Sequence, residues 1–205
     1  MNDSVSLHRA TAADGAALKR VLARAFHDEG FVSWFVRGDA RRAEGFDAFF
    51  EIYLRMALPH GLAWITTDES GVALWVPPGK WKLGLVEQVR QVPLALRAAG
   101  FPALLPRLLA VNAAEVHHPT RPHYYLLAVG VVPERQRRGI GSLLMEPGLT
   151  ICDAEGMPAY LETPSEHYLP FYEAHGFEVS ATVQMPHGGP QVWCMWREPQ
   201  RGADT

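Results

Sequence analysis

Two arginines and two glycines stand together in VVPERQRRGIGSLLME, residues 131–146, between an apolar run and a segment with helical spacing. The start of a helix carries unpaired backbone N–H groups and the positive end of the helix dipole. Gly139 and Gly141 would let an anion approach those amides, and Arg137 and Arg138 would add charge-assisted contacts. With Ser142 opening the helix, the stretch is suited to holding a pyrophosphate. A glycine-containing strand-to-helix turn with a solvated basic edge remains the alternative.

The glycine spacing excludes one phosphate-binding motif and disfavours another. A Walker A loop needs Gly-Lys followed by Ser or Thr, and the chain's only Gly-Lys pair, at residues 79–80, is followed by tryptophan. The dinucleotide fingerprint G-x-G-x-x-G fits Gly139 and Gly141, but Leu144 replaces the third glycine. Only 64 residues follow Gly141, too few for a doubly wound half and a substrate domain.

The composition limits the classes of protein to which the chain can belong. The chain has 205 residues, 48% of them apolar, and a net charge of −3, so we expect one globular domain and neither nucleic acid nor a membrane as partner. Two cysteines, Cys152 and Cys194, are too few for a secreted disulfide framework and fit a reducing, cytoplasmic location. We expect no signal peptide and no membrane span, because no basic, apolar leader and no long uncharged apolar run occur.

The periodicity of apolar residues predicts an α+β order, with strand–helix–strand units in the second half. A short strand with Val5 and Leu7 precedes a capping signature at residues 11–14 and a first helix. Further strands are predicted within 62–78 (a hairpin), at 123–133, at 158–163 and as a pair within 182–196. Further helices are predicted at 41–56, at 84–111 (broken by Pro93, Pro102 and Pro106), at 142–156 around a proline, and at 169–177.

Two motifs carry a resemblance to a known family. Residues 136–141, QRRGIG, match Q/R-x-x-G-x-G/A, the acetyl-CoA signature of the GNAT acetyltransferase superfamily. About 30 residues later, FYEAHGF at 171–177 resembles the family's helix with a tyrosine four residues before a Gly-Phe pair. The stretches HHPTRPHYYLLAVGV, YLETPSEHYLPFYEAHGF and WCMWREP resemble the puromycin N-acetyltransferase branch, closely over 117–198 and weakly before.

The resemblance implies a fold and a cosubstrate. The fold would be the α/β/α GNAT fold, in which flanking helices cover a central mixed twisted sheet with two splayed parallel strands. Acetyl-CoA would lie between the strands ending near Val131 and Glu162. Its pantetheine arm would pair with backbone at Val129, Gly130 and Val131. The pyrophosphate would sit on the amides of Arg137, Arg138, Gly139, Ile140, Gly141 and Ser142.

The resemblance also implies acetyl transfer to a primary amine by direct attack in a ternary complex. Tyr172 matches the family's tyrosine and would protonate the departing thiolate, since a phenol with a pKa near 10 stays protonated. A packed core tyrosine is the alternative. Glu162 is the candidate base, with a salt-bridging carboxylate as the alternative. One of His117 and His118 is a further candidate base, and polar loop residues are the alternative there.

The acceptor amine would be bound by the stretch AFHDEGFVSWF, which follows the first helix. Asp28 and Glu29 would attract a cationic amine, and Trp34, with two neighbouring phenylalanines, would stack on a ring. His118 is also an acceptor-site candidate. A solvated acidic turn beside an aromatic cluster is the alternative. A small-molecule amine of the aminonucleoside or antibiotic-like class is expected; protein amines, polyamines and a non-catalytic acyl-CoA-binding module are alternatives.

The remaining expectations concern organisation and assembly. We expect a single domain, 1–205, with a helical insert at 84–116 covering the acceptor cleft and an acetyl-CoA-binding core at 117–198. A membrane- or partner-binding helix is the less favoured interpretation of the insert, because its prolines would break the apolar face. We expect no metal, since His117, His118 and His123 lack a ligand pattern, and no acyl-cysteine. The family makes a homodimer a candidate assembly.

Overall fold

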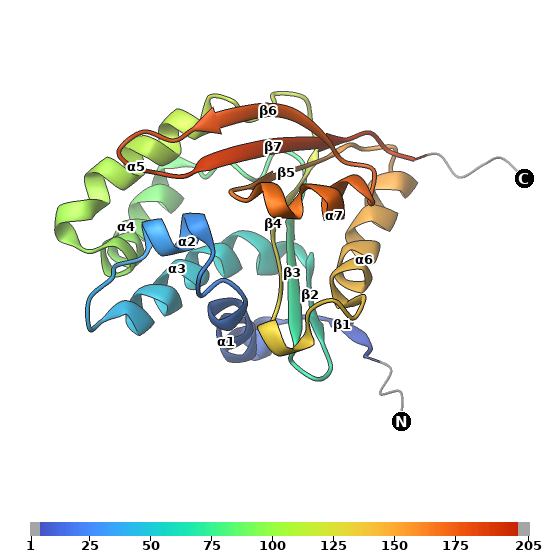
Figure 1. Cartoon of the computed structure of the whole chain (residues 1–205), viewed down its shortest axis with the longest axis horizontal. Helices are drawn as coiled ribbons and strands as arrows, with labels where there is room; N and C mark the ends of the chain where they lie inside the picture. Colours follow the sequence, from blue (N-terminus) through green and yellow to red (C-terminus); the bar gives the residue numbers. More distant parts are fainter. Residues whose placement is uncertain (1–4, 201–205) are drawn as a thin grey trace, which may run out of the picture.

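The computed structural model describes residues 5–200, which form a seven-stranded mixed sheet flanked by helices (Figure 1). The strand order is β1-β2-β3-β4-β5-β7-β6. The strands are β1 (Leu7–Arg9), β2 (Ala63–Thr66), β3 (Gly71–Val76), β4 (Tyr124–Val131), β5 (Ala159–Thr163), β6 (Glu178–Gln184) and β7 (Gln191–Arg197). Only β4 and β5 pair in parallel; the other neighbours in this sheet are antiparallel. The predicted α+β class with a central mixed sheet is confirmed.

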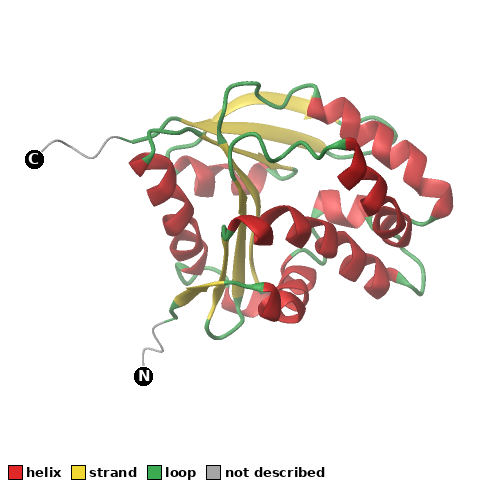
Figure 2. Ribbon diagram, turned by 180° about the vertical axis from the view of Figure 1, so that it is seen from behind, coloured by secondary structure: helices red, strands yellow, loops and turns green. Residues whose placement is uncertain are grey.

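Helices cover both faces of the sheet (Figure 2). They are α1 (Gly15–Ala25), α2 (Gly30–Phe35), α3 (Arg42–Ala57), α4 (Leu85–Ala99), α5 (Phe101–Glu115), α6 (Ile140–Ala154) and α7 (Leu169–Glu173). Short 3-10 turns occur at Ala12–Asp14, Leu58–His60, Pro133–Arg135 and Glu166–Tyr168. Side chains alternate along β3, so that Val72 and Leu74 pack with α1 and α3, whereas Ala73 and Trp75 pack with α6.

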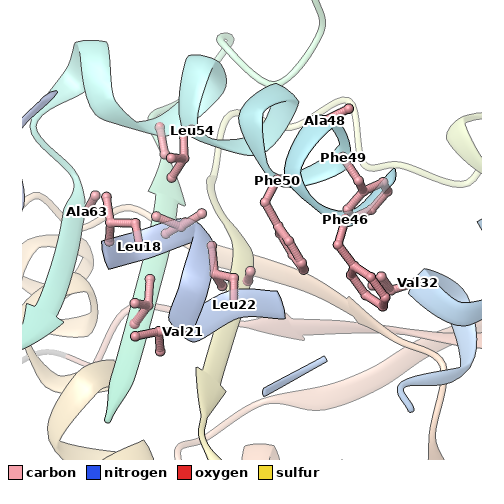
Figure 3. Close-up of a cluster of buried hydrophobic side chains, with 14 of the residues drawn as sticks. Leu18, Val21, Leu22, Val32, Phe46, Ala48, Phe49, Phe50, Leu54 and Ala63 are labelled. Carbon is pink, nitrogen blue, oxygen red and sulfur yellow. The ribbon is translucent and has the colours of Figure 1, made fainter. Parts of the chain in front are cut away.

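The helix α1 is fixed at its start and along its buried face. The predicted cap is present, since Thr11 N donates to Asp14 Oδ2 at 2.8 Å and Ala13 N donates to Thr11 Oγ1 at 3.3 Å. Leu18 and Leu22 of α1 and Phe50 of α3 are fully buried in one cluster (Figure 3). Each such side chain stabilises the fold by about 1.5–3 kcal/mol, so this cluster holds α1 against the sheet.

The sheet divides at a β-bulge in β4. Trp75 of β3 pairs with Leu126 and the preceding Leu74 pairs with Ala128, so Leu127 is an extra residue. Pairing with β5 covers only residues 124–126 of β4. Beyond that point β4 continues beside β3, while β5 continues beside β7. The two parallel strands therefore stop pairing after Leu126, and the bulged residue Leu127 follows directly.

The prolines of the 84–111 segment do not break it as the sequence predicts. Pro93 lies inside α4 and Pro106 inside α5, and the break falls at Gly100, whose φ of +80° ends α4. Pro93 is exposed, so water can hydrate the carbonyl that its missing N–H leaves free. The helix α6 likewise continues through Pro147, and it begins at Ile140 rather than at Ser142.

The helices α4 and α5 lie at one end of the molecule (Figures 1 and 2). Many of their large apolar side chains are exposed. Alanines face the body: Ala95, Ala98, Ala99, Ala110 and Ala114 are buried. The exposed set is Leu85, Val86, Val89, Val92, Leu96, Phe101, Leu105 and Leu109, followed by Val116. The expected interruption of this apolar face by prolines is therefore wrong. Within residues 5–200 no single helix is long and apolar enough to span a membrane; α4 and α5 meet the test only as a pair, bent by 118°.

Candidate active site

The end of β4 has a free backbone edge on the side that β5 leaves. Val132 N donates to Ser70 O at 2.8 Å, and Gly130 is opposite Val72, so these residues direct their backbone groups toward β3. Backbone direction alternates along a strand, and Val129 and Val131 therefore direct theirs toward the other side. Gln136 Nε2 donates to Val131 O at 3.0 Å. The remaining groups of Val129 and Val131 form an edge that an extended ligand can pair with.

Gly130 has a packing role beside this edge. A Cβ at Gly130 would lie 2.5 Å from Cε2 of Phe26 and 2.9 Å from Cβ of Ala25. Only glycine allows α1 to approach β4 this closely. The three residues proposed for the pantetheine arm therefore differ, because Val129 and Val131 present free backbone and Gly130 supports α1.

The glycine loop, residues 136–141, leads from this edge into the N-terminus of α6. Arg137 and Gly139 both adopt left-handed conformations, with φ of +59° and +80°. Gly139 is the N-cap and has no side chain to satisfy the first amides, which belong to Ile140, Gly141 and Ser142. Arg137 and Arg138 are exposed, and the first turn holds no acidic side chain. Amides, helix dipole and guanidinium groups together favour an anion here.

Tyr172 of α7 lies next to this loop. Its neighbour Phe171 packs on Gly141, where a Cβ would lie 3.2 Å from two ring atoms. The Tyr172 ring packs between Phe171 and Phe177, with centroid distances of 5.2 and 6.2 Å. Burial raises the pKa of the Tyr172 phenol above its usual value, so the phenol is protonated at neutral pH and can donate a proton.

Glu162 of β5 lies among two tyrosines and a histidine. Tyr160 and Glu162 share a face of β5, and the Tyr160 hydroxyl donates to Glu162 Oε1 at 2.9 Å. The Tyr125 hydroxyl lies 3.5 Å from Oε2. Nδ1 of His118 lies 3.7 Å from Oε1. The Glu162 side chain is 25% exposed, so the carboxylate is both held by protein groups and reachable from outside.

His118, unlike His117, belongs to this cluster. His118 is buried, its ring is stacked with Trp81 at a centroid distance of 3.6 Å, and its Nε2 lies 2.9 Å from Nε2 of His123. His117 is exposed. The loop before α4 therefore supplies the residue that covers His118.

Comparison with known proteins agrees with this geometry. The model of the acetyltransferase (GNAT) family matches residues 107–177. An uncharacterized N-acetyltransferase of Schizosaccharomyces pombe is 30% identical over 161 residues, which are 74% of this chain. The chain spans 65% of the length of that relative.

Solved structures share the fold over nearly the whole chain. One, described as histone acetyltransferase HPA2 and related acetyltransferase from Corynebacterium glutamicum, has a TM-score of 0.72, 22% identity, and coverage of 98% of this chain and 99% of that one. A polyamine N-acetyltransferase of Drosophila melanogaster has a TM-score of 0.63, 14% identity and coverage of 95% and 100%. The family model and the relative from Schizosaccharomyces pombe support the GNAT acetyltransferase superfamily, and the solved structures support its fold. The sheet of this chain, with its one parallel pair, is the GNAT fold.

The predicted acceptor stretch forms α2, a helix that the sequence analysis did not predict. Glu29 is its N-cap and accepts from Val32 N at 2.7 Å, and burial raises the pKa of the Glu29 carboxyl to about 7. The adjacent Asp28 side chain is 95% exposed. A Cβ at Gly30 would lie 3.9 Å from Cβ of Pro164, which comes just after β5. The structure therefore brings Glu29, and not Asp28, toward the Glu162 end of β5.

The aromatic residues around this region come from several elements. Trp34 packs against Phe31 at 5.9 Å and against the β6–β7 connection at Gly189. Burial, with the carboxylates of Glu29 and Glu162, raises the pKa of Tyr53 of α3. The Tyr53 hydroxyl therefore lies close enough to both carboxylates to be affected by their charge.

Sequence reasoning missed five residues of this site: Tyr53, Trp81, His123, Tyr125 and Tyr160. The one local signal was the alternation of Tyr160 and Glu162 along a predicted strand, which puts both on one face. Trp81 and Tyr53 reach the cluster from distant segments and have no local signal.

Both cysteines are buried, and burial determines the reactivity of their thiols. Burial raises the pKa of Cys152 to about 12 and also raises that of Cys194, so neither thiol forms a reactive thiolate at neutral pH. Among the residues that the structure describes, no three His, Cys, Asp or Glu side chains are arranged to hold a metal ion.

Proposed function

We propose that the chain is an acetyl-CoA-dependent N-acetyltransferase acting on a primary amine of a small molecule. One observation carries the proposal: a free strand edge at Val129 and Val131 continues through the glycine loop into the unpaired amides of α6. An elongated cosubstrate with amide groups at one end and a pyrophosphate at the other needs both features in this order.

The chain's own residues would hold acetyl-CoA along this path. Backbone groups of Val129 and Val131 would pair with the amides of the pantetheine arm. The amides of Ile140, Gly141 and Ser142 would bind the pyrophosphate, and Arg137 and Arg138 would neutralise its charge.

The transfer step uses the two candidate catalytic residues. The amine nitrogen attacks the thioester carbonyl, an N–C bond forms and the C–S bond breaks. Glu162 takes the proton that the amine loses, directly or through water, and Tyr172 gives a proton to the departing sulfur. Solvent then restores the proton of Tyr172 and removes the one from Glu162.

For the acceptor we propose an amine of the aminonucleoside or antibiotic-like class. Its support is the resemblance to the puromycin N-acetyltransferase branch and the combination of Glu29 with the aromatic rings of Phe31 and Trp34. The insert at 84–116 would cover this acceptor region, which agrees with the stacking of the nearby Trp81 on His118.

A polyamine is the second candidate acceptor. The carboxylates of Glu29 and Glu162 both raise the pKa of Tyr53, so both lie near its hydroxyl. A dication bound there could contact the two carboxylates. The structures of an agmatine N-acetyltransferase and of the Drosophila enzyme, at TM-scores of 0.67 and 0.63, share only the fold with this chain at 15% and 14% identity.

The test is release of free CoA, read with a thiol reagent, from purified protein and acetyl-CoA across a panel of amines. The panel contains puromycin, other aminonucleosides, aminoglycosides, polyamines and short peptides. Release with aminonucleosides or aminoglycosides supports the proposal, and release with polyamines alone selects the second candidate. Tight acetyl-CoA binding by calorimetry without release from any amine would indicate a non-catalytic acyl-CoA-binding module. No binding at all would overturn the assignment of the glycine loop.

A further inference from the structure

A buried pair of histidines lies behind Glu162, and the transfer chemistry above does not use it. His118 and His123 are 7% and 2% exposed, and their Nε2 atoms are 2.9 Å apart. At that distance the two nitrogens share one proton, since two N–H groups would repel each other. The pair therefore has a definite donor and a definite acceptor.

The backbone decides which histidine is the acceptor. Nδ1 of His123 lies 2.7 Å from the carbonyl oxygen of Arg121, which can only accept, so His123 carries its proton on Nδ1. Burial lowers the pKa of His123 and keeps its ring neutral, which leaves Nε2 as an acceptor. His118 must then carry a proton on Nε2.

This tautomer determines the protonation of Nδ1, the other ring nitrogen of His118. A neutral His118 with a proton on Nε2 has a lone pair on Nδ1, and Nδ1 faces Glu162 Oε1 at 3.7 Å. These two acceptor atoms can share one additional proton once the carboxylate receives it. The His118 side chain is 3% exposed and the Glu162 side chain 25% exposed, so a substrate can reach only the carboxylate.

We propose that His118 is a positioning residue that shares with Glu162 the proton removed from the acceptor amine, and that His123 sets its tautomer. The inference rests on the proposed function, because it concerns the base of that reaction. The amine nitrogen loses the proton, Glu162 receives it at a carboxylate oxygen, and His118 Nδ1 holds it on the far side. After the amide has formed, the proton returns to solvent through Glu162.

The surroundings favour this charge arrangement. Trp81 stacks on His118 at an interplanar angle of 24°, which stabilises an imidazolium by a cation–π contact and covers it from water. The other titratable or charged groups facing the pair are Tyr125 of β4, Tyr160 of β5, Cys194 of β7, Tyr53 of α3 and, through Tyr53, Glu29 of α2. Burial and Glu162 raise the pKa of Tyr125 and Tyr160, so both phenols remain neutral donors.

The first test does not depend on activity. Long-range ¹H–¹⁵N spectra of histidine-labelled full-length protein report which ring nitrogen carries the proton, with signals assigned from His118→Gln and His123→Gln. We expect His123 protonated on Nδ1 and neutral His118 protonated on Nε2. A neutral His118 protonated on Nδ1 would overturn the proposal, whether or not an acceptor amine has been found.

The second test uses the active amine and three variants. His118→Gln should lower kcat about 10- to 100-fold, leave the KM for acetyl-CoA unchanged, and move the acidic limb of the pH–rate profile to lower pH. His123→Leu removes the acceptor for the Nε2 proton of His118 and should behave like His118→Gln, whereas His123→Gln keeps an acceptor and should shift the acidic limb less than His123→Leu does. The exposed His8→Gln serves as control. An unchanged pH profile in His118→Gln would overturn the inference while leaving the acetyltransferase assignment intact.

Discussion

Gly130 of β4 lies against the ring of Phe26, so closely that a Cβ at this position would be 2.5 Å from a ring carbon. The contact fixes the distance between the C-terminal end of α1 and the strand whose next residue, Val131, belongs to the free edge. We expect Gly130→Ala to destabilise the fold by about 1–3 kcal/mol, because the Phe26 ring and the Cβ of Ala25, which is fixed to the backbone of α1, would both have to shift.

Thermal unfolding checks this first prediction. Gly15→Ala is the matched control, since a Cβ at Gly15, the first residue of α1, would meet nothing within 4 Å. The control should keep or raise the Tm, because alanine favours a helix over glycine. Equal Tm values for the two variants would contradict the packing role of Gly130.

A second prediction concerns the positive charge of the glycine loop. Arg138→Ala should weaken acetyl-CoA binding about 3- to 30-fold at low salt, and the loss should shrink as salt is added, because exposed charges are screened. Calorimetry with acetyl-CoA measures the affinity. Arg55→Ala, which removes an exposed arginine paired with Glu51 on α3, is the control and should bind normally. A salt-independent loss would point to a damaged loop conformation.

Tyr172 is predicted to act in the transfer step and not in binding. Tyr172→Phe keeps the ring that packs between Phe171 and Phe177 and removes only the hydroxyl. We expect kcat to fall about 10- to 100-fold, with nearly unchanged acetyl-CoA affinity and Tm. Steady-state kinetics and calorimetry separate the two effects. Unchanged turnover would leave Tyr172 as a core tyrosine.

Glu29 should make stability depend on pH. Its folded-state pKa of about 7 lies above the ordinary carboxyl value of 4.5, so the folded state binds the proton more tightly than the unfolded chain. The free energy of unfolding should therefore fall as pH rises from about 4.5 to about 7, by an amount on the order of 3 kcal/mol. Above about pH 7 the folded state carries the full cost of an ionised, buried Glu29 carboxylate.

Denaturant unfolding at several pH values checks this dependence. Glu29→Gln should remove most of it and be more stable than wild type at alkaline pH, since a neutral side chain can still accept from Val32 N. Asp28→Asn changes the same charge at an exposed neighbour and should leave the wild-type slope. If both variants follow the wild-type curve, burial of Glu29 does not set the slope.

Local signals were enough for most elements of this fold. The Thr11–Asp14 cap, the hairpin turn and the turn from strand to helix at the glycine loop are each determined by residues close in sequence, and the structure confirms these elements. The continuity of α4 through Pro93 was not predictable in this way, because it depends on solvent reaching one side of the helix.

The candidate site was predictable only where a motif marks it. The sequence motifs named Tyr172, Glu162 and the glycine loop, but the partners of Glu162 come from two strands and from the segment between α5 and β4. Whether His117 or His118 faces Glu162 depends on the direction in which the chain enters β4, which no local pattern reports. The capping role of Glu29 was hidden because α2 has only six residues and little periodicity.

The extra residue at Leu127 also has a consequence for insertions and deletions. Before it, Tyr124 and Leu126 pack with α6; after it, Ala128 and Val132 pack with α1 and α3, while Val129 and Val131 pack with α6. Removing one residue here would reverse the second half of the strand, turning valine side chains toward Phe26, where only glycine fits, and the ligand-pairing backbone groups toward β3. The chain should therefore permit no change in length at position 127, so homologous chains can be aligned across it without a gap.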